Sequence, residues 1–244
     1  PGAGALAMWL HRWRRQREFG KSLVDRAVAG IRGDFVFDIA EGDMAALRAE
    51  HARGKGVILL ASHVGCWHSA LTRLATLLPV PASVVMWRDE GAYDRHYLEH
   101  SGDTPLLSII DSSEGPKSAV AMIQRLQGGG VLSIMGDRPM EGARHCAVSF
   151  LGGTVRLPFT PFYLASVSGA PIVIFFVYRT GPGTARNSLG GVISVPGNLG
   201  KEPEAYAPYM QLYADALERS VTEAPYQFFN FYNMWDDDEH QRKA

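Results

Sequence analysis

Short apolar runs between residues 56 and 135 place the strongest constraint on how this chain can fold. Continuous apolar runs of this length are typical of strands buried on both faces, as in parallel sheets. Stretches with helical length and spacing separate most of them, and Gly128 to Gly130 end one of these stretches. This alternation predicts an α/β sheet with helical crossovers. The predicted strands are Gly56–Ser62, Ser83–Trp87, Leu106–Ile110 and Val131–Met135, and the predicted helices are Cys66–Leu78 and Glu114–Leu126.

The rest of the chain continues this pattern. A chain of 244 residues with 46% apolar composition can bury one large core, and neither a repeat nor a linker divides it. We therefore expect an N-terminal helix within residues 1–32 and one α/β domain over residues 33–244. Further predicted elements are a turn at Leu151–Gly153, a helix over Thr160–Val167, strands over Pro171–Tyr178 and Gly191–Val195, and a helix over Glu202–Val221.

The predicted N-terminal helix combines an apolar period of 3.6 residues with a basic polar side. Tryptophans and arginines in one amphipathic helix are typical of a helix lying in the headgroup region of an anionic membrane. A solvated helix packed on the core is an equal alternative. The apolar positions are Leu6, Trp9, Leu10, Trp13, Val24, Ala27, Val28 and Ile31, and the basic ones are Arg12, Arg14, Arg15, Arg17, Lys21 and Arg26.

Composition excludes some classes of protein. A formal net charge of −1 argues against a nucleic-acid-binding face. Two cysteines are too few for a disulfide scaffold and favour a reducing, cytoplasmic setting. The longest apolar stretch, Phe162 to Tyr178, contains Ser, Gly and Pro and reads as a helix and a strand, so we expect no membrane span. No signal peptide is visible, but a chain opening at Pro1 leaves a preceding anchor open.

The segment most indicative of chemistry is Ala61 to His68, in which a buried strand runs into His63, a glycine and a helix. Ligands of open α/β sheets bind beyond the carboxyl ends of the strands, where His63 is expected. An imidazole there suits proton transfer from a hydroxyl that attacks an acyl carbonyl.

A second strand end carries Met135-Gly136-Asp137-Arg138-Pro139. Asp137 and Arg138 should reach the same sheet edge as His63, and an arginine there is suited to bind phosphate or carboxylate. An ion pair that pins a loop is the structural alternative. Arg88, after another predicted strand, is expected at the same edge, either on a substrate phosphate or solvated.

The order of the segments Ser-His-Val-Gly-Cys-Trp, Gly-Asp-Arg-Pro and Phe-Leu-Gly-Gly-Thr-Val-Arg-Leu-Pro resembles the lipid A biosynthesis acyltransferase branch of the lysophospholipid acyltransferase superfamily, over about residues 20 to 235. The resemblance implies acyl transfer from an acyl carrier protein or coenzyme A thioester to a hydroxyl of a lipid or glycolipid. It also implies a peripheral position on the cytoplasmic face of the bacterial inner membrane, with no further cofactor. By position in these motifs, the candidate substrate-binding residues are Gly65, Cys66, Phe150, Gly152, Arg156 and Pro158, together with Arg88 and Arg138.

One position departs from the family pattern. The family's catalytic histidine is followed five residues later by Asp or Glu, whereas His63 is followed by His68. A carboxylate would hold one tautomer of the ring and stabilise its imidazolium, which a second imidazole does less well. Three outcomes are open: Asp137 substitutes in space, His68 supports a slower or different reaction, or the site only binds acyl lipids.

Other readings of the same residues stay open. His63, Cys66 and His68 are zinc-ligand types within six residues, although their spacing matches no zinc signature, and we expect no metal. Cys66 is alternatively a nucleophile or a small core residue. The aromatic run Tyr226–Trp235 either lines an acyl site or packs on the core. The competing functions are a catalytically silent lipid-binding protein and a thioester or lipid hydrolase.

Overall fold

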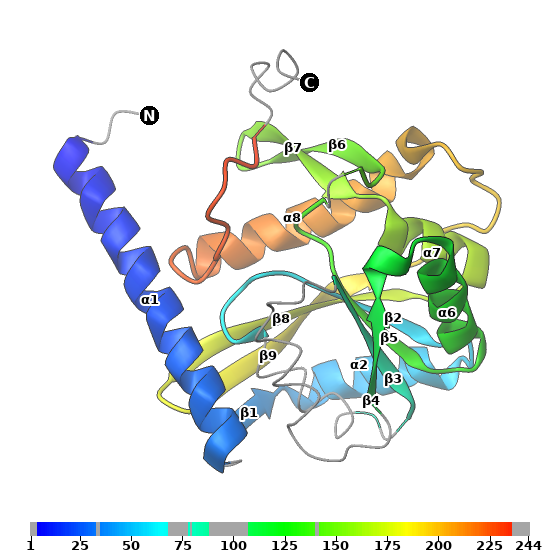
Figure 1. Ribbon diagram of the computed structural model, residues 1–244, viewed down its shortest axis with the longest axis horizontal. Coiled ribbons are helices and arrows are strands. Elements are labelled where there is room, and N and C mark those ends of the chain that lie inside the picture. Colours follow the sequence, from blue (N-terminus) through cyan, green and yellow to red (C-terminus); the bar gives the residue numbers. More distant parts are fainter. Residues whose placement is uncertain are drawn as a thin grey trace.

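The computed structural model describes residues 4–32, 35–67, 78, 80–87, 107–139 and 142–235. A mixed sheet of seven strands forms its centre, in the order β1-β9-β8-β2-β5-β3-β4 (Figure 1). Neighbouring strands are parallel except for the β8–β9 pair, which is antiparallel. The predicted mostly parallel α/β sheet is thus confirmed. The strands are β1 (Val36–Ile39), β2 (Val57–Ala61), β3 (Ala82–Met86), β4 (Leu107–Asp111), β5 (Val131–Met135), β8 (Ile172–Gly181) and β9 (Thr184–Ile193).

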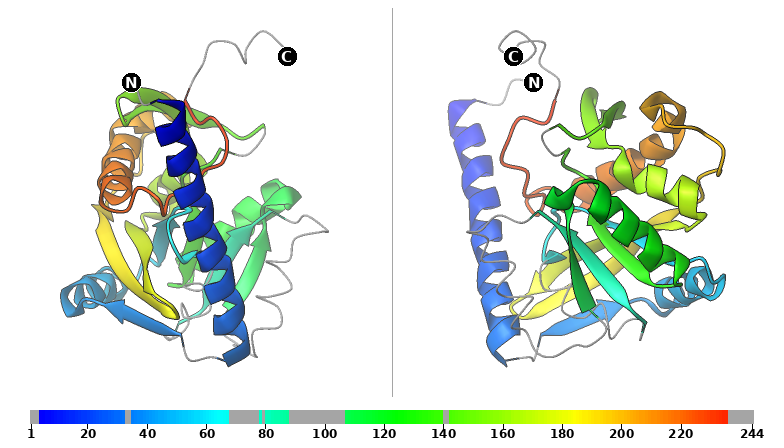
Figure 2. Two further views of the ribbon diagram at one scale, coloured as in Figure 1. Left: turned by 90° about the vertical axis from the view of Figure 1, so that its left-hand side faces the viewer. Right: turned by 45° about the vertical axis from the view of Figure 1, so that its right-hand side comes forward.

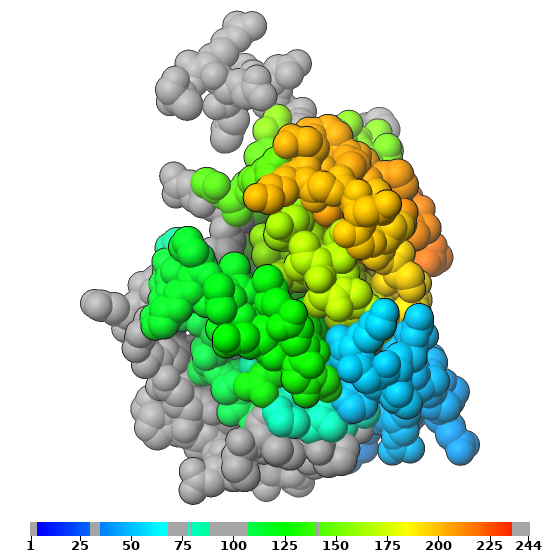
Figure 3. Space-filling view, turned by 90° about the vertical axis from the view of Figure 1, so that its right-hand side faces the viewer, coloured from blue at the N-terminus to red at the C-terminus, as the bar shows by residue number. Residues whose placement is uncertain are grey.

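Helices cover both faces of this sheet because the central strands are apolar on both sides. In β2, Ile58 and Leu60 join the core cluster formed with α6, α7 and α8, whereas Val57 and Leu59 join the cluster that contains Leu47 of α2. Figure 3 looks at a side of the molecule from which the helices of both clusters, α6 and α7 of the first and α2 of the second, are visible. The helices are α2 (Glu41–Ala52), α6 (Pro116–Gln127), α7 (Thr160–Ser168) and α8 (Ala207–Glu223), with short 3-10 turns at Ser112–Glu114 and Pro203–Tyr206.

A two-stranded antiparallel hairpin, β6 (His145–Phe150) and β7 (Gly153–Pro158), lies over α8, outside the main sheet. It contains the segment for which the sequence predicted only a turn at Leu151–Gly153. Side chains of β6 alternate between buried and exposed, and the buried Val148 and Phe150 extend the core over α8.

Helix α1 (Ala5–Arg32) runs along one side of the domain, outside the layers (Figures 1 and 2). Its second half is attached to the sheet: Asp25 pairs with Arg179 of β8, and Ala29 packs against the cluster around Phe35 and Phe175. Its first half leaves large apolar side chains exposed. Among the described helices, none is long and apolar enough to cross a membrane.

Candidate active site

Strand register brings His63 and Asp137 to the same place. Ala61 at the end of β2 pairs with Met135 at the end of β5 in a parallel ladder, so His63 and Asp137 each lie two residues beyond a paired position. The Gly136 amide donates to the Ala61 carbonyl at 2.9 Å and keeps the two loops together. The sequence expectation that both side chains reach one sheet edge is therefore met in the geometry.

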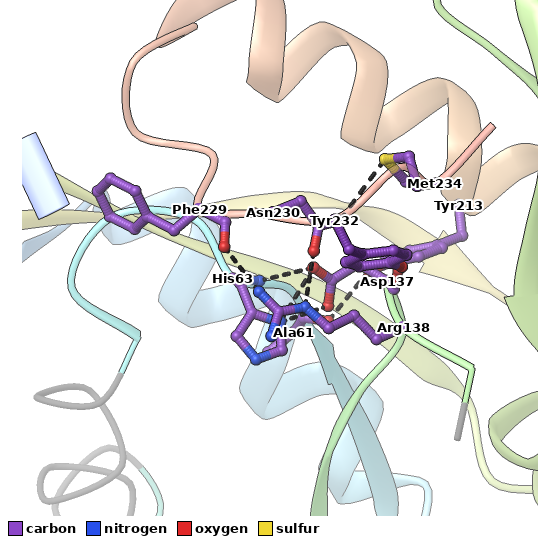
Figure 4. Close-up of polar contacts among 9 residues, drawn as sticks. All are labelled: Ala61, His63, Asp137, Arg138, Tyr213, Phe229, Asn230, Tyr232 and Met234. Atoms are coloured by element: carbon purple, nitrogen blue, oxygen red, sulfur yellow. Dashed lines mark hydrogen bonds and ion pairs between the residues drawn. The ribbon is translucent and has the colours of Figure 1, made fainter. Parts of the chain in front are cut away.

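Asp137 holds His63 by three contacts (Figure 4). His63 Nδ1 lies 2.9 Å from Oδ1 and 3.0 Å from Oδ2 of Asp137, and the His63 amide donates to Oδ2 at 3.1 Å. The Asp137 side chain is fully buried, whereas that of His63 is 17% exposed. An ionised carboxylate only accepts hydrogen bonds, so Nδ1 carries the proton and Nε2 of the neutral ring is the proton acceptor. No hydrogen bond to Nε2 is formed by the described residues.

Aromatic side chains surround this pair. Trp67 meets the His63 ring edge-on, with centroids 5.0 Å apart, and Trp67 also contacts Phe229. Tyr213, fully buried beneath the site, donates to the Ala61 carbonyl at 3.0 Å. Burial, together with the nearby Asp137, raises the pKa of Tyr213 well above its usual value, so Tyr213 remains a neutral hydrogen-bond donor.

The C-terminal segment, residues 226–235, closes over the same edge of the sheet. The Phe229 amide donates to the His63 carbonyl at 2.8 Å, and Val64 forms a bridge with Phe228. Arg138 donates from Nε to Asn230 Oδ1 and from Nη2 to the Phe229 carbonyl, both at 2.6 Å. Figure 4 shows His63, Asp137 and Arg138 gathered beneath this segment. The sequence named the run Tyr226–Trp235 only as an acyl-site lining or a core element, and the contacts of Asn230 and Phe229 with Arg138 and His63 were not predicted.

Gly65 and Cys66 are packing residues in this structure. Gly65 has φ +57°, and a Cβ added there would lie 2.0 Å from the Val177 carbonyl oxygen. Cys66 is 1% exposed and packs with Phe175 and Val177. Burial, with a smaller effect from Asp25, raises the pKa of its thiol to about 12, which disfavours the thiolate that a nucleophile requires.

The motif around Phe150 builds the hairpin that supports the C-terminal segment. Phe150 is 1% exposed, and its ring contacts those of Phe228 and Trp235. Gly152 occupies the β6–β7 turn with φ +77°. Arg156 lies 3.0 Å from the His145 ring across the hairpin, and Pro158 pairs with the same residue. Of these predicted substrate-binding residues, Phe150 is connected to the His63 region through the C-terminal segment. Substrate contact by all four stays a prediction.

His68 and Arg88 lie outside the described residues, as does most of the predicted helix Cys66–Leu78. No group of three or more His, Cys, Asp or Glu side chains suited to a metal ion occurs in the described part of the chain.

The fold and site define a class: an α/β protein with a carboxylate-oriented histidine beyond the ends of parallel strands, an arrangement suited to general-base chemistry on a hydroxyl. A family model for bacterial lipid A biosynthesis acyltransferases matches residues 31–237. The chain belongs to this family, and it is an acyltransferase whose family transfers acyl groups to lipid acceptors. No curated protein matches the chain in a sequence comparison.

Proposed function

We propose that this protein transfers a fatty acyl group from an acyl thioester to a hydroxyl group of a lipid or glycolipid, with His63 as the general base. The observation that carries the proposal is the hydrogen bond between His63 Nδ1 and the buried carboxylate of Asp137. Because Nδ1 donates its proton to this carboxylate, Nε2 is left as the basic nitrogen of the ring. The family assignment supports the reaction class.

In this mechanism Nε2 takes the proton of the acceptor hydroxyl while the hydroxyl oxygen attacks the thioester carbonyl carbon. The resulting tetrahedral intermediate breaks its carbon–sulfur bond, and the imidazolium returns the proton to the leaving thiolate. Asp137 stabilises the imidazolium that exists between these two transfers. No metal or organic cofactor takes part beyond the thioester donor.

Asp137 supplies the carboxylate that the family pattern has at the position of His68. Of the three outcomes left open by the sequence, the contacts of Asp137 favour its substitution in space. In this proposal His68 has no required part in proton transfer.

The donor is an acyl carrier protein or coenzyme A thioester, both of which carry phosphate on the arm that ends in sulfur. Arg138 supports this choice because the Phe229 backbone connects it to His63. The Phe229 amide donates to the His63 carbonyl, and the Phe229 carbonyl accepts from Arg138. Guanidinium groups bind phosphate well.

Proton transfer by His63 is tested with purified protein, palmitoyl-CoA or palmitoyl carrier protein, and a lipid extract as acceptor. We expect thiol release together with an acylated lipid, and loss of both in His63→Ala. His51→Ala is the matched control, because His51 lies in α2 and contacts the Gly129 carbonyl. Free fatty acid at full rate without acceptor would instead indicate a hydrolase, and acyl-lipid binding without thioester consumption a silent binding protein.

We also propose a peripheral position on the cytoplasmic face of the bacterial inner membrane, reached through the first half of α1. Leu6, Trp9 and Trp13 are 71%, 59% and 48% exposed and recur at helical spacing, with arginines interleaved. Exposed tryptophans and arginines on one helix suit an anionic lipid surface.

Vesicle co-sedimentation tests this membrane contact. We expect binding to phosphatidylglycerol-containing vesicles that exceeds binding to phosphatidylcholine alone and that falls in the double variant Trp9→Ala with Trp13→Ala. Leu212→Ala, an exposed apolar position on α8, is the control. Equal binding by the double variant and the wild type would contradict the assignment of α1.

A further inference from the structure

The guanidinium of Arg138 is held by neutral groups only. Its Nε and Nη2 atoms form the side edge of the guanidinium fork, and this edge donates to the Asn230 amide oxygen and the Phe229 carbonyl. The Tyr232 ring lies 5.8 Å from its central carbon. None of these partners carries a negative charge.

No carboxylate of the described residues forms an ion pair with Arg138. Its hydrogen bonds and ring contact are those given above, and no ion pair is formed there. The adjacent Asp137 directs both oxygens to His63. Arg138 therefore forms no ion pair among these residues, and Nη1 remains without a hydrogen-bond partner there.

The C-terminal segment fixes this cation relative to His63. Phe229 donates through its amide to the His63 carbonyl and accepts through its own carbonyl from Arg138. Helix α1 braces the segment: Arg15 donates to the Asn230 carbonyl at 3.2 Å, and Phe19 packs against Phe229 and Phe231. Phe229 thus connects the base His63 to the guanidinium of Arg138. Its neighbour Asn230 is 5% exposed and is contacted by Arg138 on one side and by Arg15 on the other.

We propose that Asn230 is a positioning residue that determines specificity for a phosphate-bearing substrate. Its neutral oxygen holds the side edge of Arg138 without forming an ion pair, so that Nη1 and the guanidinium charge are left to bind a phosphate group. Aspartate at this position would have the same shape but would neutralise the guanidinium. This inference rests on the proposed function, because it assumes that the phosphate belongs to the acyl donor or to the lipid acceptor.

The experiment compares Asn230→Asp with Asn233→Asp, which places the same charge on the same segment at an exposed position whose side-chain oxygen accepts from the Trp235 amide. Each variant is assayed with palmitoyl-CoA and with the phosphate-free palmitoyl thioester of N-acetylcysteamine. Each donor is combined with a phosphorylated and an unphosphorylated lipid acceptor.

For Asn230→Asp we expect KM for the phosphate-bearing substrate to rise by about tenfold to a hundredfold, the range for losing a hydrogen bond to a charged partner. Turnover of the phosphate-free pair should be unchanged, and Asn233→Asp should behave as wild type. Dependence on the donor phosphate or on the acceptor phosphate identifies the source, and either supports the proposal. Equal loss with all substrates, no loss, or equal effects of the two variants would overturn it.

Asn230→Ser, which keeps a neutral oxygen, is the companion variant and should retain more phosphate-dependent activity than Asn230→Asp. Should Asn230→Asp fail to fold, Asn230→Ser is tested for binding of the non-reactive thioether analogue of palmitoyl-CoA and of the phosphorylated lipid acceptor. Weaker binding of either ligand, with unchanged turnover of the phosphate-free pair, supports the proposal. Unchanged binding of both ligands, or an equal loss in turnover of the phosphate-free pair, overturns it. Calorimetry measures binding of the thioether analogue and requires no turnover. Failure of this inference is therefore distinguishable from failure of the proposed acyltransfer reaction, which is tested separately by the comparison of His63→Ala with wild type.

Discussion

Replacing Asp137 by Asn should reduce kcat by about a thousandfold with little change in KM. The substitution keeps the shape of a side chain that is fully buried and makes all three contacts with His63. It removes the charge that stabilises the imidazolium. Unit charges about 4 Å apart interact by about 4 kcal/mol at an effective dielectric constant of about 20, and about 1.4 kcal/mol corresponds to tenfold in rate.

The amide also presents a donor where His63 Nδ1 requires an acceptor, so the ring must change its tautomer or lose a contact. The assay is thiol release from palmitoyl-CoA at saturating acceptor, with thermal unfolding measured in parallel. Asp215→Asn, on the exposed side of α8, is the control for removal of a negative charge. A loss below about tenfold in folded Asp137→Asn protein would refute the role given to this carboxylate.

Further predictions concern neighbouring positions. Cys66→Ala should retain acyl transfer. The native Cys66 thiol should resist iodoacetamide at pH 8 until the protein is unfolded, because its pKa is raised to about 12. Rapid labelling of the folded protein, detected by mass spectrometry, would contradict this. Gly65→Ala should destabilise the protein by about 3 kcal/mol or more in urea unfolding, since the added Cβ meets the Val177 carbonyl. Gly152→Ala, which has a similar φ but open space, should cost about 1–2 kcal/mol, and equal costs would show that the close approach is unimportant.

Much of the sheet was predictable because its central strands are apolar on both faces. The run Val131–Met135 coincides with β5, and the predictions for β2, β3, β4 and the start of β8 differ from the structure by a residue or so. The edge strand β1 and the hairpin strands β6 and β7 were not predicted, and only the last residues of β9 were. β1 has alternating, partly exposed residues, and the first part of β9 is polar, so neither has a continuous apolar run.

The candidate site likewise contains a part that was predicted from the sequence and a part that was not. Strand ends in a parallel sheet meet at one edge, so the sequence placed His63 beside the Asp137 loop and named Asp137 as a candidate for the missing carboxylate. The aromatic run that contains residues 229 and 230 was named as an acyl-site lining or a core element, but the contacts of these two residues with Arg138 were not predicted. Phe229 acts through its backbone, which any residue type supplies, and nothing local marks Asn230 as the partner of an arginine 92 positions earlier.

The long chain separations within the site restrict how this protein can be divided. His63 and Asp137 are 74 positions apart, and Arg138 and Asn230 are 92 apart. Loop closure over such distances is slow relative to local folding. Because His63 precedes Asp137 by 74 positions, His63 is also synthesised well before the residue that orients its ring. A split-protein reporter or a transplanted fragment would have to supply α1 together with residues 57 to 235 to reproduce the assembled centre.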